Sequence, residues 1–150
     1  MGMLDSECIF SSGQAVTAIG DTPSTNIYDT GASYNNPQNS EAAMTSENLW
    51  IQVSVSTAVA GAGATVAAVL QDSADGTTFA DVLSGTLQPP ANLTAGTNIM
   101  QVQPPTGTRR YWRIVYRVVG AVLTAGKFDA YLSNTIQRNV QRPSGIPPVG

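Results

Sequence analysis

The spacing of its apolar residues constrains the fold of this chain more than any other feature. From Gln14 to Ser133, apolar and polar residues alternate with a period of two, and no window of a dozen residues carries apolar side chains at helical spacing. Because successive side chains of a strand point to opposite faces, this alternation indicates strands with one buried face. The sequence therefore predicts an all-β chain.

The clearest strand runs from Arg110 to Val118. One of its faces carries only apolar or aromatic residues, which we expect in the core: Trp112, Ile114, Tyr116 and Val118. A second strand, Leu49 to Val55, alternates in the same way. About eight short strands result, the other six being Gln14–Ile19, Thr25–Asp29, Thr65–Gln71, Thr78–Leu83, Thr97–Gln103 and Gly126–Ser133.

Turn signals separate these strands without any crossover helix. Asp75-Gly76 favours a tight turn, and Pro89-Pro90 and Pro104-Pro105 cannot continue a central strand. Strands joined in this way form antiparallel sheets, so we predict a β-sandwich of jelly-roll type. At 150 residues one domain suffices. We expect an extended N-terminal arm over 1–12, the sandwich over 13–133 with a long polar connection at 31–48, and an extended C-terminal tail over 134–150.

Charges are few and sorted along the chain. Only 11% of residues are charged; residues 1–108 hold nine acids and no base, whereas residues 109–150 hold all seven bases and one acid, Asp129. This asymmetry predicts two surfaces of opposite sign. The net charge of −3 and the single Lys127 argue against nucleic acid as a partner.

The residue types that are missing exclude several classes of function. Without histidine there is no Ser/His/Asp relay and no His-ligated zinc, and the lone Cys8 can form neither an internal disulfide nor a cysteine metal cage. No segment has the length and apolarity of a membrane span, and the N-terminus lacks the features of a signal peptide. We therefore expect neither an enzyme nor a cofactor, metal or membrane protein, although two carboxylates from distant strands could still meet as in a glycosidase.

Three short motifs have simpler interpretations than the functional ones. Gly61-Ala62-Gly63 lacks the third glycine and the helix of a phosphate-binding turn, so it predicts a hairpin loop. The run from Asp72 to Gly76 lacks the distal glutamate of a calcium loop and predicts a β-turn. The sequon at Asn92 has no secretory context and is attributed to chance.

Arginines form the most distinctive cluster. Arg113 and Arg117 lie four apart on one strand and so share a face, with Arg109 and Arg110 just before that strand. They either solubilise an exposed sheet face or bind carboxylates of a neighbouring protein, because guanidinium groups bind carboxylates in a bidentate geometry.

Two stretches resemble a family of capsid cement proteins of tailed phages. The first is Met3-Leu4-Asp5 with Ile9-Phe10-Ser11 and Gln14-Ala15-Val16-Thr17; the second runs from Pro90 through Pro104-Pro105-Thr106-Gly107-Thr108 to Ile114 and continues to Gly120 and Thr124-Ala125-Gly126-Lys127. The polar loop at 31–48 and the proline-rich tail depart from the family.

The resemblance implies a jelly-roll protein that assembles as a homodimer or homotrimer. It would be made in the host cytoplasm and would bind the outside of an icosahedral shell, where it bridges neighbouring major capsid proteins. Repeated weak contacts then add up to a strong lattice. The residues we expect at the capsid or subunit interface are Leu4, Ile9, Phe10, Arg109, Arg113, Arg117, Ile136, Arg138, Val140 and Arg142.

Two other classes of function stay open. Another virion sandwich, such as a tail, head-fibre or glycan-binding adhesin protein, shares this composition, and glycan binding would use exposed aromatics such as Tyr34, Trp50 and Tyr111. A hydrolase would need a carboxylate with a perturbed pKa in a cleft.

Overall fold

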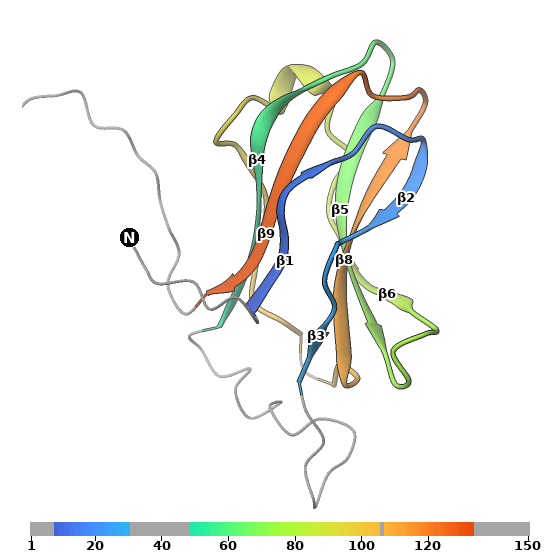
Figure 1. Cartoon of the computed structure of the whole chain (residues 1–150), viewed down its shortest axis with the longest axis vertical. Helices are drawn as coiled ribbons and strands as arrows, with labels where there is room; N and C mark the ends of the chain where they lie inside the picture. Colours follow the sequence, from blue (N-terminus) through green and yellow to red (C-terminus); the bar gives the residue numbers. More distant parts are fainter. Residues whose placement is uncertain (1–7, 31–48, 106, 134–150) are drawn as a thin grey trace, which may run out of the picture.

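Two antiparallel sheets pack face to face in the computed structural model, which describes residues 8–30, 49–105 and 107–133 (Figure 1). The strands are β1 (Ile9–Ala15), β2 (Gly20–Pro23), β3 (Tyr28–Asp29), β4 (Trp50–Ala60), β5 (Thr65–Ser73), β6 (Ala80–Ser84), β7 (Asn98–Val102), β8 (Tyr111–Val119) and β9 (Ala125–Ser133). A short 3-10 helix, η3 (Pro90–Asn92), precedes β7. The all-β sandwich predicted from the sequence is confirmed.

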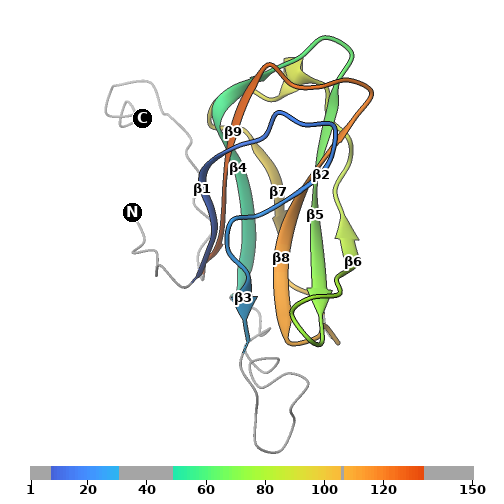
Figure 2. The ribbon, with the colours of Figure 1, turned by 45° about the vertical axis from the view of Figure 1, so that its right-hand side comes forward.

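The chain passes back and forth between the two sheets. The first sheet has the order β1-β9-β4-β7, and the second has the order β2-β8-β5-β6, with β3 also pairing with β8. Thus β1 and β2, β4 and β5, and β8 and β9 are successive strands in different sheets (Figure 2). The jelly-roll type stays a prediction, and this order is compatible with it.

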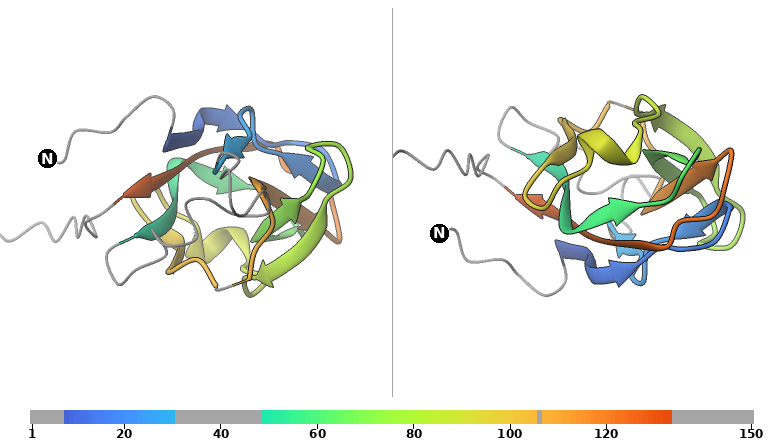
Figure 3. Two further views of the ribbon diagram at one scale, coloured as in Figure 1. Left: turned by 90° about the horizontal axis from the view of Figure 1, so that it is seen from below. Right: turned by 90° about the horizontal axis from the view of Figure 1, so that it is seen from above.

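The core side chains lie between the two sheets, whose face-to-face arrangement Figure 3 shows end-on. In β8 the predicted face is buried: Trp112, Ile114, Tyr116 and Val118 are each at most 1% exposed. On the facing sheet, Ile51, Val53 and Val55 of β4 are buried, and Tyr116 stacks on Phe128 at 4.8 Å between ring centroids. Alternation along the strands therefore located the core correctly.

The first part of the chain differs from the expected strands. A strand was expected from Gln14 to Ile19, but β1 begins at Ile9 and ends at Ala15, and a turn at residues 16–19 leads into β2. The expected strand at Thr25–Asp29 is reduced to β3. The physical reason is that Val16 and Gly20 pair with different sheets, so the chain changes sheet where one strand was expected.

Five predicted interface residues lie outside the described residues: Leu4, Ile136, Arg138, Val140 and Arg142. The same holds for most of both predicted terminal segments and for the connection at 31–48. Within the described ranges, no helix has the length and apolarity to cross a membrane.

Candidate interaction surfaces

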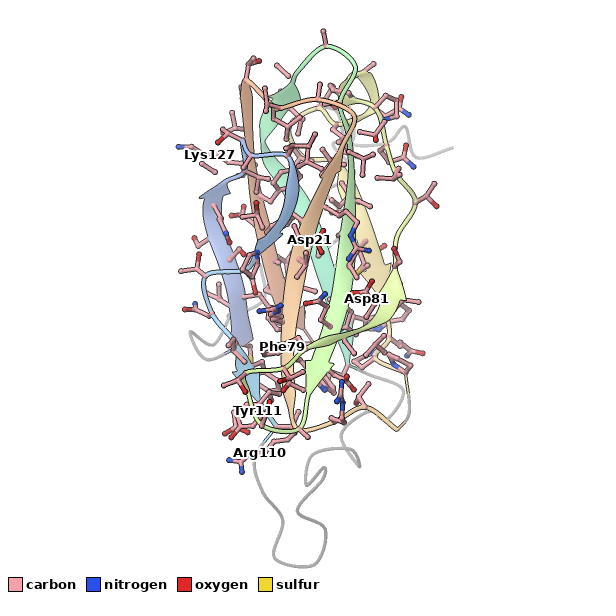
Figure 4. The ribbon with its side chains drawn as sticks, turned by 90° about the vertical axis from the view of Figure 1, so that its right-hand side faces the viewer. Asp21, Phe79, Asp81, Arg110, Tyr111 and Lys127 are labelled. Carbon is pink, nitrogen blue, oxygen red and sulfur yellow. The ribbon has the colours of Figure 1, made fainter. Side chains whose placement is uncertain are left out.

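Arg117 joins three strands across the outer face of the second sheet. Its Nε donates to Asp21 Oδ1 on β2 at 2.7 Å, and its Nη1 donates to Asp81 Oδ2 on β6 at 2.9 Å. The residue opposite Arg117 on the intervening β5 is the small Ala67, which leaves room for the guanidinium to reach β6. Figure 4 shows Asp21 and Asp81 at mid-height on this face.

Arg113, four residues before Arg117 on β8, extends this contact into a network. Its Nε donates to Gln71 Oε1 at 2.8 Å, and Gln71 Nε2 donates to Asp81 Oδ1 at 2.6 Å. The guanidinium also lies over the ring of Phe79, 3.9 Å from its centroid. Desolvation by burial lowers the pKa of Arg113. Both predicted arginines of β8 therefore have partners on their own sheet.

Two further arginines, just before β8, bind carboxylates, and Arg110 does so in the bidentate manner. Arg110 Nε and Nη2 donate to the two carboxylate oxygens of Asp29 at 2.7 and 2.8 Å. Arg109 donates from Nε and Nη2 to Asp72 Oδ1, and its backbone N–H donates to Asp72 Oδ2 at 2.8 Å. Hydrogen bonds donated to these carboxylates raise the pKa of both arginines.

These pairs explain much of the charge asymmetry of the chain. Asp21, Asp29, Asp72 and Asp81 belong to early strands, and their partners lie on or beside β8, a late strand that sits between β2 and β5. Sequence order, rather than two separate surfaces, thus sorts these charges. Arg109, Arg113 and Arg117 all have partners within the chain. Their contact with a neighbouring protein stays a prediction.

Ile9 and Phe10, predicted as contacts of the arm, lie in β1. Phe10 is only 1% exposed and packs edge-on against Tyr28 at 6.4 Å between ring centroids. Ile9 pairs with Tyr131 of β9 and is half-buried. In the chain described here Phe10 is therefore a core residue, because a ring of its size contributes most when it fills the sandwich.

An exposed apolar cluster forms one end of the sandwich. This loop end consists of Val119, the last residue of β8, and of the loops 16–19, 61–64 and 120–124, which join β1 to β2, β4 to β5 and β8 to β9 (Figures 1 and 2). Ile19, Val119 and Val122 are 56%, 44% and 57% exposed there. Because Gly20 pairs with Val118, Ile19 and Val119 lie side by side. Grouped exposed apolar side chains are typical of interaction sites.

Backbone contacts hold the loop end in one shape. Leu123 N–H donates to Thr17 O at 3.0 Å, and Thr124 N–H donates to Ala60 O at 2.8 Å. Gly120 has φ +95°, and a Cβ at this position would overlap the carbonyl oxygen of Gly63. Only glycine allows this approach of the two loops. The apolar side chains therefore stand on a preformed surface, which reduces the entropy lost on binding.

Sequence reasoning missed the loop end. A signal was present: the three loops carry no charged residue, yet they include Ile19 and Val122 among glycines and alanines. Polar side chains would be expected in exposed turns. The sequence alone does not show that these three loops lie close together, since the first and the last are about a hundred residues apart along the chain.

The run from Asp72 to Gly76 forms a turn, as predicted from the sequence. Asp75 Oδ1 accepts hydrogen bonds from the N–H groups of Thr77 and Thr78 at 2.9 and 2.8 Å, and Gly76 adopts φ +76°. These bonds, with that from Ser73, lower the pKa of Asp75. Among the described residues, no group of three or more His, Cys, Asp or Glu could hold a metal ion.

Comparison with known proteins places most of the sandwich in one family. The family model Bbp16 matches residues 10–132, from the second residue of β1 to the last but one of β9. The match therefore covers more than half of the chain. A search of the curated proteins finds no match.

Proposed function

We propose that this chain, which belongs to the Bbp16 family, is a structural protein of a phage particle that cements the capsid. It binds the outside of the icosahedral shell and bridges neighbouring major capsid proteins. It acts as a homo-oligomer, a dimer or a trimer. Such a role needs a rigid body and repeated contacts, because many weak contacts on one lattice give strong attachment.

The loop end is the observation that carries this proposal. It presents Ile19, Val119 and Val122 without a charged neighbour in the three loops, on backbone that close glycine contacts fix in place. Removing an exposed aliphatic side chain from water contributes about 1.5–3 kcal/mol at most. A contact of this size is weak alone and effective when it recurs over a shell.

The arginine network supports the same role in another way. It joins β2, β8, β5 and β6 on the outer face of the second sheet, so a load on one strand is shared by the others. The resemblance of the sequence to capsid cement proteins of tailed phages adds the class of partner. Contacts from Leu4 and from the segment Ile136 to Arg142 remain part of the proposal.

Binding to empty expanded shells that lack this protein tests the proposal. Wild-type protein is expected to co-sediment with the shells, and the pair of substitutions Ile19→Asp and Val122→Asp is expected to reduce the bound fraction at least about tenfold, since a buried charge costs several kcal/mol. Ile27→Asp is the matched control, because Ile27 is 46% exposed but lies between β2 and β3.

The control residue is distant from the loop end. Tyr28, its neighbour, pairs with Trp112, which lies seven residues before Val119 on β8, roughly 23 Å along the strand. Equal loss of binding for both sets of variants would contradict the proposed contact. No binding of the wild-type protein to shells, with binding to tails, fibres or host glycans instead, would favour the other virion roles.

A further inference from the structure

The outward side of the first sheet carries a cluster of aromatic and amide side chains. Gln52 of β4 pairs with Tyr131 of β9 on one side and with Gln101 of β7 on the other. Trp50 lies two residues before Gln52 and so shares its face. Their neighbours Ile51 and Val53 are fully buried and point into the core. We call Trp50, Gln52, Gln101 and Tyr131 the outer amide face.

This face is less accessible than its place in a two-layer sandwich leads one to expect. Gln52 is 4% exposed and Tyr131 is 8% exposed. Desolvation by burial also raises the pKa of Tyr131. In a sandwich of two sheets, residues that point away from the core usually face water.

Two polar atoms of the outer amide face are buried and unpartnered. Gln52 Nε2 donates to Asn98 Oδ1 at 3.1 Å, but Gln52 Oε1 has no donor. Gln101 Nε2, on the adjacent strand, has no acceptor. Buried polar groups almost always have hydrogen-bond partners. The face therefore offers one free acceptor and one free donor on neighbouring strands.

A peptide group is the chemical complement of this pair. Its N–H can donate to Gln52 Oε1 and its C=O can accept from Gln101 Nε2. Trp50 and Tyr131 beside the amides provide rings on which proline and aliphatic side chains pack. Proline-containing extended segments commonly dock on aromatic surfaces, because they lose little conformational entropy on binding.

The residues that follow β9 match these requirements. They begin directly after Ser133, which pairs with Trp50, so they start at the border of the face. Their sequence holds Ile136 and Val140 together with Pro143, Pro147 and Pro148. Seventeen extended residues can span roughly 55 Å, whereas the eleven residues of β4 span roughly 36 Å. The segment is therefore long enough to turn back and cross the face.

We propose that the outer amide face binds residues 134–150 of the same chain in the unassembled protein, with a peptide group of that segment between Gln52 and Gln101. This binding is separate from the contact of the loop end with the shell, so either proposal can fail alone.

Accessibility of Trp50 in the full chain tests the inference. The chain has two tryptophans, and Trp112 is 1% exposed and serves as an internal control. We expect Ile136→Asp with Val140→Asp to raise acrylamide quenching of Trp50 about twofold or more by releasing the segment. The indole N–H signal of Trp50 should shift in nuclear magnetic resonance spectra while that of Trp112 stays in place. Unchanged quenching of Trp50 would overturn the inference.

A second variant tests the hydrogen bonds. If Gln101 Nε2 has no partner, Gln101→Met is neutral or stabilising, because it removes an unsatisfied polar group. If it binds the segment, the same change raises quenching of Trp50. If Gln101→Met leaves the quenching of Trp50 unchanged, the inference is overturned. Loss of Trp50 protection on dilution would also overturn it, since the occupant would then be a second copy.

Discussion

Arg117 shows what single residues contribute to this sandwich. Its guanidinium binds two carboxylates, Asp21 and Asp81, that come from strands on either side of β8 and β5. All three side chains are 30–44% exposed, so each pair contributes modestly, about 0.2–1 kcal/mol. The value of the arrangement is that one residue ties three strands together.

Removing this guanidinium should therefore cost little but measurably. We expect Arg117→Gln to lower the free energy of unfolding by about 1 kcal/mol, since two exposed pairs are lost. Urea denaturation measures this change. Lys127→Gln, at an exposed cation of β9, is the control with the same change of charge. Equal effects of the two substitutions would show that the network contributes nothing beyond net charge.

The same network predicts a dependence of stability on pH. Hydrogen bonds from Arg117 hold the pKa of Asp21 and of Asp81 below the value in the unfolded chain. A carboxyl group of this kind stabilises the fold above its unfolded pKa, and the contribution is lost as pH falls through the lower, folded pKa. We expect the melting temperature to fall below about pH 4.

Thermal melts of the wild type and of Arg117→Gln from neutral to acidic pH measure this effect. The slope below about pH 4 should be smaller in the variant, because its two aspartates no longer have lowered pKa values. Identical slopes would mean that other carboxylates cause the acid sensitivity.

For single residues, the sequence predicted which face of a strand a side chain occupies but not the residue that it binds. Four-residue spacing correctly placed Arg113 and Arg117 on one face of β8. It could not show that Asp21 lies beside Arg117, because 96 residues separate them along the chain. Only the strand order β2-β8-β5-β6 brings the charges together.

Among the elements, the loop end depends on glycine more than any strand does. Gly120 adopts φ +95° directly against the carbonyl of Gly63, whereas Gly96 adopts φ +88° with open space around it. Both positions are strained for any other residue, but only Gly120 lacks room for a side chain.

This contrast gives a matched pair of substitutions. Gly96→Ala should cost about 1–2 kcal/mol from backbone strain alone. Gly120→Ala should cost about 1–3 kcal/mol more, because the two loops must move apart. Chemical denaturation measures both. If the two variants lose the same stability, the close approach of the loops is not a constraint on the fold.

Strands were predictable from the sequence where apolar and polar residues alternate regularly and turn residues mark the strand ends. Alternation in β8 and β4 revealed both the strands and the sides they bury. It failed between Gln14 and Ile19, because an apolar–polar pattern continues through a turn that moves the chain from one sheet to the other. Apolar–polar alternation with a period of two does not indicate to which of the two sheets a residue belongs.

In the whole molecule, the parts that stabilise the fold differ from the part that we propose to contact the shell. The core holds the two sheets together and the arginine network stabilises the second sheet, while the loop end presents apolar side chains on fixed backbone. Sequence reasoning reached the fold class and proposed the role from resemblance. It did not find the loop end, since three loops distant in sequence form it.

The copy number of this protein in particles tests most directly whether it cements a phage capsid. Particles purified from infected cells would be analysed by quantitative mass spectrometry against the major capsid protein. We expect about equal copy numbers, because a cement protein recurs over the whole lattice. A few copies per particle, confined to the tail or a fibre, would contradict the proposal.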